Sequence, residues 1–276
     1  MVISKTGGTL PWHLEDIDFD RIDPSRIASD HDLYYLLISA SFVESGADLY
    51  TRNLVDFFAA DPEVSGWLED HWQPEELQHG RALRSYVGHA WPQFDWDRAF
   101  RGFLAEYSAY CTVDEFAPTR GLELAARCVV ETGTTTLYRA LGAAADEPVL
   151  KQLAAHIARD EVRHYKHFYD YFRRYDQVEK LGRHRIAGAL ARKALETRQL
   201  DSECALRHVY RAPAPASIDC SADFAIVKRR VNALVMRHIS ARSTAKMFLR
   251  PLAMPPVLQS TAEAVVAGVA QRLIIR

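Results

Sequence analysis

The chain has 276 residues and a mass of 31.3 kDa, with 48% hydrophobic and 25% charged residues. This is the composition of an ordinary globular protein with a substantial core, and it excludes a disordered or collagen-like chain. The longest nearly apolar stretch, residues 33–43, contains serines and is shorter than the ~20 residues that a bilayer requires. The first residues also lack the basic start and apolar block of a secretory signal. We therefore expect a cytoplasmic protein without a membrane span.

The cysteines and the charge distribution narrow the possible functions further. The four cysteines form no CxxC pair, which argues against a disulfide scaffold and against a thiolate metal cluster. The net charge of -2 excludes a generally polybasic protein that binds nucleic acid. Residues 221–276 are nevertheless basic, because nine Lys or Arg stand against only Asp223 and Glu263. A solvated helical face explains this basic segment, and a docking face for an acidic partner is the alternative.

Helical periodicity recurs along the chain and strand signals are scarce, so the predicted class is all-α. Asp61 and Pro62 end the first expected helix, and the Glu147-Pro148 pair separates two later ones. Residues 211–217 are rich in proline and alanine and predict a linker, with two shorter basic helices beyond it. The expected helices before the linker span residues 30–60, 67–87, 96–116, 120–144, 149–175 and 179–210.

Two Glu-x-x-His motifs are the main indication of function in the sequence. Glu76 precedes His79, and Glu161 precedes His164, in both cases within an expected helix. The i, i+3 spacing puts the carboxylate and the imidazole on one helix face, where the pair can bind one metal ion.

A lone glutamate precedes each motif on the helix before it. Glu44 stands 32 residues ahead of Glu76, and Glu131 stands 30 residues ahead of Glu161. Both lie on stripes of apolar and small residues, so we expect them to face the interior of a helical bundle.

Four buried carboxylates without partners are costly or become protonated, whereas two divalent cations cancel four negative charges. One glutamate from each of two helices, with Glu-x-x-His from each of two others, is the ligand set of ferritin-like di-iron and di-manganese bundles. Oxygen and imidazole donors without thiolate favour iron or manganese. The alternative is a set of helices with coincidental Glu and His pairs on the surface.

Two stretches resemble the paired motifs of soluble acyl-acyl carrier protein desaturases, the type 2 fatty acid desaturases of the ferritin-like superfamily. They are WQPEELQHGRAL, residues 72–83, and IARDEVRHYKHFY, residues 157–169, and the resemblance covers residues 30–175. It implies a ferritin-like antiparallel four-helix bundle with additional helices, in which Glu76 and Glu131 bridge two metal ions. The metal ligands that it implies are Glu44, Glu76, His79, Glu131, Glu161 and His164.

The resemblance also implies roles for residues around the metals. Asp160 matches the position that accepts the second ring N–H of His79, and Glu75 is the candidate counterpart for His164. Thr134, one helical turn after the third-helix glutamate, matches a threonine that can donate to metal-bound oxygen or relay a proton; a threonine that bonds its own backbone is the alternative. Trp12 is a candidate for the family's electron entry path.

The function that the resemblance implies is an O2-dependent di-iron oxidoreductase that removes hydrogen from an acyl chain. Its cofactors would be two Fe ions, with Mn or mixed Fe/Mn possible, and O2 would be the co-substrate. The implied partners are an acyl substrate on acyl carrier protein, an external electron donor such as ferredoxin, and a second copy in a homodimer. Two alternatives stay open: a di-iron hydroxylase or N-oxygenase of another substrate, and a non-catalytic ferritin-like metal-binding protein. We expect residues 1–178 to form the bundle with an N-terminal arm, and residues 179–276 a helical extension.

Overall fold

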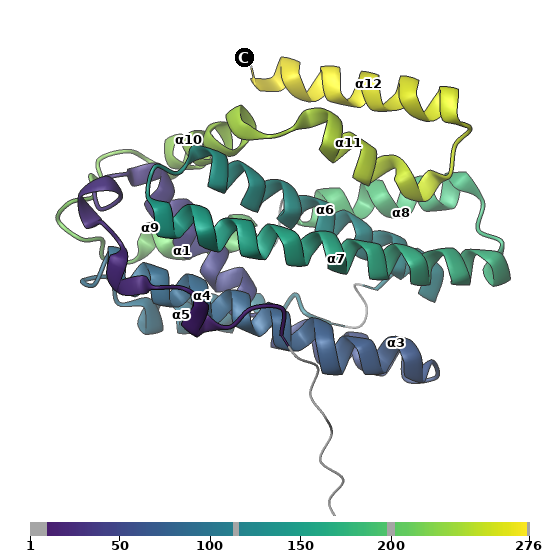
Figure 1. The fold of residues 1–276 in the computed structure, drawn as a ribbon, viewed down its shortest axis with the longest axis horizontal. Helices are drawn as coiled ribbons and strands as arrows, with labels where there is room; N and C mark the ends of the chain where they lie inside the picture. Colours follow the sequence, from purple (N-terminus) through teal and green to yellow (C-terminus); the bar gives the residue numbers. More distant parts are fainter. Residues whose placement is uncertain (1–9, 113–115, 198–201, 275–276) are drawn as a thin grey trace, which may run out of the picture.

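The structure, a computed structural model, describes residues 10–112, 116–197 and 202–274, and these residues form helices joined by turns (Figure 1). No strand occurs in the described ranges, so the expected all-α class is confirmed. Short helical turns precede the first long helix at Leu14–Asp16, Phe19–Arg21 and Pro24–Arg26. The α-helices are α1 (His31–Ser45), α2 (Asp48–Phe57), α3 (Pro62–Trp67), α4 (Gln73–Ala90), α5 (Trp96–Tyr107), α6 (Arg120–Ala144), α7 (Pro148–Glu179), α8 (Arg183–Glu196), α9 (Ser202–Arg211), α10 (Phe224–His238), α11 (Ala241–Leu249) and α12 (Pro256–Ile274).

Four helices form the bundle, in two antiparallel pairs. Helix α1 runs against α4, because Tyr34 packs edge-on against Trp91 at one end while Ser45 lies against Gly80 at the other. Helices α6 and α7 form a long hairpin that runs horizontally through Figure 1. The expected antiparallel four-helix bundle with additional helices is therefore the fold of this chain.

Side chains that accept backbone N–H groups begin three of the four bundle helices, α1, α6 and α7. Asp30 accepts from Leu33 N at 3.0 Å, and Thr119 caps α6 in the same way through Leu122 N. Glu147, which is fully buried, accepts from Leu150 N at 2.7 Å and so fixes the start of α7. These caps satisfy donors that the first turn of a helix leaves unpaired.

Several expected boundaries are wrong. The helix expected over 30–60 is interrupted at Gly46, where backbone hydrogen bonds tighten to i, i+3 and α2 begins anew. The helix expected over 67–87 includes a wider π-type turn, Leu68–Trp72, before α4.

Further departures occur outside the bundle core. Helix α5 ends at Tyr107 rather than at residue 116, and the helix expected over 179–210 is divided into α8 and α9. Residues 113–115 and 198–201 of these expected helices lie outside the described ranges. Three helices, rather than two, follow the linker.

Two hydrophobic clusters occupy opposite ends of the bundle. In α7, residues up to Ala158 belong to the first cluster, and residues from Tyr165 onward belong to the second. In α6 the order along the chain is reversed, with Val129 in the second cluster and Tyr138 in the first. In α6 and α7 this leaves a short interval between the clusters, and Glu131, Glu161 and His164 fall in it.

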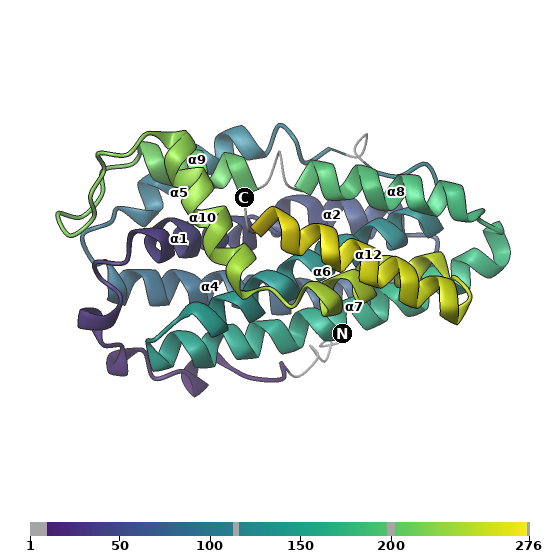
Figure 2. The same cartoon turned by 90° about the horizontal axis from the view of Figure 1, so that it is seen from above.

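Helices α8 to α12 pack on the outside of this bundle (Figures 1 and 2). Helix α8 lies against α6, α9 lies against α1 and α5, and α10 lies against α6 and α1. Figure 2 shows α10 and α12 nearest the viewer, on the side formed by the end of the chain. Among the described helices, none has the length and apolar character needed to cross a membrane. The division at residue 178 stays a prediction.

The close approach of α1 and α4 makes Gly80 sensitive to substitution. A Cβ atom at this position would lie 2.8 Å from the backbone nitrogen of Ser45 and 2.9 Å from its Cα. We expect Gly80→Ala to lower the free energy of unfolding by about 1–3 kcal/mol, because the backbone of α1 must move. Thermal unfolding followed by circular dichroism measures this change.

Gly88, in the same helix, supplies the control. A Cβ there meets no atom within 4 Å. Gly88→Ala should therefore raise stability by about 0.5–1 kcal/mol, since alanine loses less backbone entropy than glycine in a helix. Equal effects at the two glycines would contradict the close contact.

Candidate metal centre

The bundle brings the six predicted ligands together in its interior. They come from four helices: one from the last turn of α1, two from α4, one from α6 and two from α7. All are at most 5% exposed. They are Glu44, Glu76, His79, Glu131, Glu161 and His164.

The donor atoms form two adjoining groups, and the ligand atoms within each group lie within 4.8 Å of one another. One group contains Glu44 and His79, the other contains Glu131 and His164, and both contain Glu76 and Glu161. Glu76 and Glu161 therefore lie within reach of both groups, and bridging by Glu76 and Glu131 stays a prediction.

The imidazole nitrogens face the carboxylates without a completed hydrogen bond. His79 Nδ1 lies 3.2 Å from Glu161 Oε1, and His164 Nδ1 lies 3.0 Å from Glu76 Oε1. Both Nδ1 atoms, together with Glu161 Oε1 and Glu131 Oε2, are buried polar atoms without a hydrogen-bond partner among the described residues. Unpartnered polar atoms of this kind are costly in a protein interior. A metal ion bound by each group would satisfy all four atoms, so these donors fit a dinuclear cation site.

The cluster is short of positive charge. Burial raises the pKa of Glu131 to about 8, and burial together with repulsion by Glu76 raises the pKa of Glu44. Burial by itself lowers the pKa of His79, but the carboxylates of Asp160 and Glu161 outweigh it and raise the pKa well above its ordinary value. These shifts favour the protonated forms of Glu44, Glu131 and His79, because the buried carboxylates need compensating positive charge.

An outer layer of carboxylates orients both histidines. Asp160 Oδ2 lies 3.0 Å from His79 Nε2, and Glu75 Oε2 lies 2.9 Å from His164 Nε2. Arg163 joins the two carboxylates, since its Nη2 lies 2.7 Å from Asp160 Oδ1 and 2.8 Å from Glu75 Oε2. A carboxylate that accepts the second ring N–H fixes the tautomer that leaves Nδ1 free for a metal.

Trp12 continues this chain of hydrogen bonds. Its Nε1 donates to Asp160 Oδ2 at 2.7 Å, and its backbone carbonyl accepts from Gln78 Nε2 at 2.8 Å. The indole is buried and stacks nearly parallel to His79, with an angle of 8° between the rings. The path from Trp12 through Asp160 to His79 is thus continuous, although the sequence around Trp12 has no counterpart in the desaturase motifs.

Thr134 lies beside the shared glutamate. Its Oγ1 lies 2.6 Å from Glu161 Oε2, while the backbone carbonyls of Val130 and Glu131 are both at 3.3 Å. The short contact with the carboxylate distinguishes Thr134 from a threonine whose hydroxyl bonds only the backbone of its own helix.

Sequence reasoning missed Tyr138 as a site residue. This buried side chain, two helical turns after Glu131, donates a short hydrogen bond to Glu44 and so ties α6 to α1. Its place on the inward stripe of α6 was the available signal, but a tyrosine on such a stripe commonly serves core packing.

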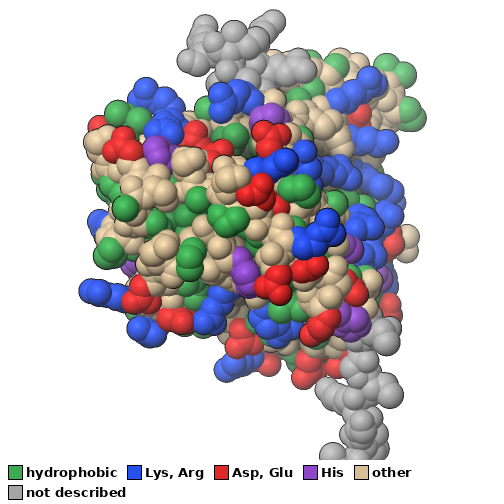
Figure 3. Space-filling view, turned by 60° about the vertical axis from the view of Figure 1, so that its left-hand side comes forward, with side chains coloured by type: hydrophobic (Ala, Val, Ile, Leu, Met, Phe, Trp, Pro, Cys, Tyr) green, Lys and Arg blue, Asp and Glu red, His purple; other side chains and the backbone are tan. Residues whose placement is uncertain are grey.

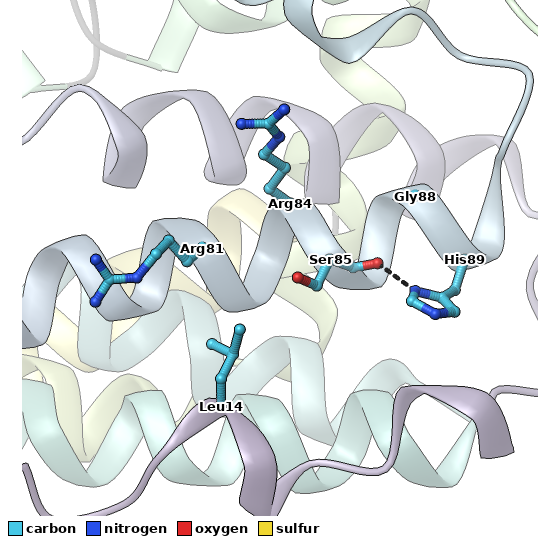
Figure 4. Close-up of a pocket in the computed structure, with 6 residues that line it drawn as sticks. All are labelled: Leu14, Arg81, Arg84, Ser85, Gly88 and His89. Atoms are coloured by element: carbon cyan, nitrogen blue, oxygen red, sulfur yellow. Dashed lines mark hydrogen bonds between the residues drawn. The ribbon is translucent and has the colours of Figure 1, made fainter.

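Two other features lie away from this centre. Glu106, Cys204 and His208 form a smaller group, in which Glu106 already pairs with His208 and Arg207. A surface hollow of about 420 Å³ lies between α4 and the N-terminal segment, and Figure 4 shows Leu14 facing the helix across it. Its lining residues are Leu14, Arg81, Arg84, Ser85, Gly88 and His89.

Comparison with known proteins supports the fold. No protein-family model and no curated protein matches the chain. A solved tyrosine-to-phenylalanine mutant of an R2-like ligand-binding oxidase, with an anaerobically reconstituted Mn/Fe cofactor, has a TM-score of 0.52 and 13% identity; 96% of this chain and 88% of that chain are covered. A glutamate-to-aspartate mutant with an aerobically reconstituted cofactor has a TM-score of 0.42, 15% identity, and coverage of 83% and 89%. The first likeness shows the ferritin-like fold.

Glu76→Gln separates metal binding from stability. Burial and repulsion by Glu161 raise the pKa of Glu76. A neutral amide at this position therefore removes an unfavourable buried charge from the metal-free protein. We expect the metal-free variant to unfold at no lower a temperature than the wild type, while the rise in melting temperature with Fe(II) or Mn(II) is lost. Calorimetry with and without metal, and metal analysis, measure both effects. A variant that still binds two ions per chain would contradict the site.

Arg163 tests the outer layer. We expect Arg163→Met to weaken metal affinity about 10- to 100-fold, because Glu75 and Asp160 lose the cation that holds them in place. Competition with a fluorescent chelator measures the affinity. Arg159→Met is the matched control, since this exposed arginine is hydrogen-bonded to the Ala155 carbonyl and to His156 and forms no ion pair with the described residues. Equal losses in the two variants would show that Arg163 has no specific role.

Proposed function

We propose that this chain binds two iron or manganese ions, or one of each, and acts as an O2-dependent oxidoreductase. The observation that carries the proposal is the pair of donor groups that share Glu76 and Glu161 and present unpartnered Nδ1 atoms to the same interior space. The R2-like ligand-binding oxidase that resembles this fold carries a Mn/Fe cofactor, which agrees with the donor types here.

Two such ions, when bound, supply the redox chemistry that activates O2 and oxidises an organic substrate. The protein holds the ligands in place and excludes water. Hydrophobic clusters on both sides of the site keep bulk solvent away, with Phe168 and Trp72 on one side and Phe42 and Leu83 on the other. A dry site prevents loss of reactive species to water.

Proton handling falls to Thr134. Its hydroxyl holds a proton 2.6 Å from Glu161 Oε2, at the carboxylate that both donor groups share. We propose that this hydroxyl donates a hydrogen bond to the oxygen substrate when the carboxylate shifts, which is the role that the desaturase resemblance implies.

Electrons would enter along Trp12, Asp160 and His79, three side chains joined by hydrogen bonds of 2.7 and 3.0 Å. The surface hollow lies close to this path, because Leu14 is only two residues from Trp12. Arg81, which lines this hollow, suits an acidic external donor such as ferredoxin, whereas Arg84 already pairs with Asp97.

For the substrate, we propose an acyl chain held by acyl carrier protein, oxidised in a desaturase-like reaction by a homodimeric enzyme. The support is the resemblance of residues 72–83 and 157–169 to the desaturase motifs. Hydroxylation or N-oxygenation of another substrate would use the same six ligands, and storage of metal without turnover would need only their affinity.

A single-turnover experiment distinguishes these outcomes. The metal-free protein is loaded with Fe(II) under anaerobic conditions, mixed with acyl thioesters on carrier protein, reduced, exposed to O2 and analysed by mass spectrometry. Desaturation removes about two mass units, whereas hydroxylation adds about sixteen. We expect the loss, and we expect Trp12→Phe to slow turnover driven by ferredoxin while leaving the metal content unchanged.

The controls decide the class of protein. Glu161→Gln should abolish product together with metal binding. A gain of oxygen would support the hydroxylase alternative. Two bound ions without product from any acyl thioester would contradict the acyl substrate, and iron uptake far beyond two ions per chain would indicate a storage protein.

A further inference from the structure

Helix α12 places its large aliphatic residues on the outside of the molecule. Val257 is 78% exposed, Leu258 is 58% exposed and Val265 is 61% exposed. At 100° per residue these three side chains share one face with Thr261 and Ala264, and no charged residue lies among them. The charged residue of α12 whose side chain is described, Glu263, is on the other side and bonds Gln259.

The side chain of α12 that is buried among those the structure describes is a small one. Ala267 of α12 packs with Ala241 and Ala245 of α11, and these three alanines form a separate small cluster. A surface helix normally buries its large apolar residues and exposes its polar ones. The order is inverted here, so the outer face of α12 needs a covering that the described residues do not supply.

Exposed aliphatic residues elsewhere on the molecule are isolated. Val178 and Leu195 are exposed on α7 and α8, each without a similar neighbour in its helix, which is ordinary for a globular protein. The face in Figure 3 likewise intersperses acidic, basic and hydrophobic side chains. The row on α12 is contiguous and therefore calls for a partner.

Exposed cations lie on the two helices that contact α12. On α10, which contacts α12, Arg229 and Arg237 lie on the exposed face with Ile226. On α11, Arg242 and Lys246 directly follow Ala241 and Ala245, the two alanines that pack with Ala267 of α12. These four cations form no ion pair with the described residues, whereas Lys228 and Arg230 of α10 pair with Glu203 and Asp32.

We propose that the layer formed by α10, α11 and α12 binds the surface of an anionic lipid bilayer. Figure 1 shows the three helices on one side of the bundle, with α12 outermost and lying over α11. Val257, Leu258 and Val265 enter the boundary between headgroups and acyl chains, while the cations contact lipid phosphates. The helices lie on the membrane and do not cross it. The proposal does not depend on the metal centre.

Charge favours a lipid surface over the two other partners considered, a second copy of the chain and an acidic protein. A symmetric contact between two copies would bring the basic layer of one chain against the same layer of the other, and like charges would repel. An acidic protein would satisfy the cations. A lipid surface satisfies both the cations and the row over residues 257–265, which is about two and a half turns long and contains no charged residue on that face.

Vesicle flotation with the full-length chain tests the proposal. The chain is mixed with vesicles of phosphatidylcholine alone, or of phosphatidylcholine with phosphatidylglycerol, and the bound fraction is measured. We expect binding only to the anionic vesicles. Leu258→Gln with Val265→Gln should abolish it, and Arg229→Gln with Arg237→Gln should weaken it about fivefold for each cation removed.

Matched variants exclude general effects of charge and hydrophobicity. Arg98→Gln with Arg101→Gln removes two exposed cations from α5, on the opposite side of the bundle, and Val178→Gln with Leu195→Gln removes two isolated aliphatic residues. Both should bind as the wild type does. Circular dichroism verifies that each variant is folded, and Leu258→Trp should shift its fluorescence to shorter wavelength on anionic vesicles.

Three results would overturn the proposal. The first is no binding to anionic vesicles. The second is binding that the α5 cation variant reduces as much as the α10 variant does. The third is a dimer in light scattering that Leu258→Gln with Val265→Gln converts to a monomer in the absence of lipid, which would assign the face to a second copy.

Discussion

Negative charge in an apolar interior is the constraint on which this structure depends. Four carboxylates lie between two hydrophobic clusters, at most 5% exposed, and two imidazoles are the nearest groups that can become positive. Burial opposes ionisation, and repulsion between the carboxylates adds to it, so the interior must acquire protons or metal ions. These buried carboxylates lower the stability of the bundle. Their presence therefore indicates a site for a ligand.

The surrounding residues reduce this cost in successive layers. Glu75 and Asp160 accept the outer N–H groups of the histidines, and Arg163 neutralises both carboxylates at once. Tyr138 and Thr134 each donate to a carboxylate of the site. Four of the six ligands, Glu44, His79, Glu161 and His164, are thus oriented by a partner behind them, which is how a protein keeps ligands in position before a metal arrives.

The ends of the chain connect this interior to its surroundings. Trp12 is carried by the N-terminal segment to Asp160, 148 residues away, and joins the site to the surface beside α4. The C-terminal helices take no part in the ligand set and instead cover α6 with a basic, partly apolar layer. Redox partner and lipid would therefore meet different sides of the molecule, and neither would compete with the other for the bundle.

The sequence by itself determined the all-α class, helix α6 from residue 120 to 144, and the six residues that meet, because helical periodicity and i, i+3 spacing are local. It did not determine the break at Gly46, the shared position of Glu161, the bond from Tyr138 to Glu44 or the outward row on α12. These depend on which helices approach one another, and how closely. Only the packed bundle sets those distances, since contacts between residues far apart in the chain leave no local periodic signal.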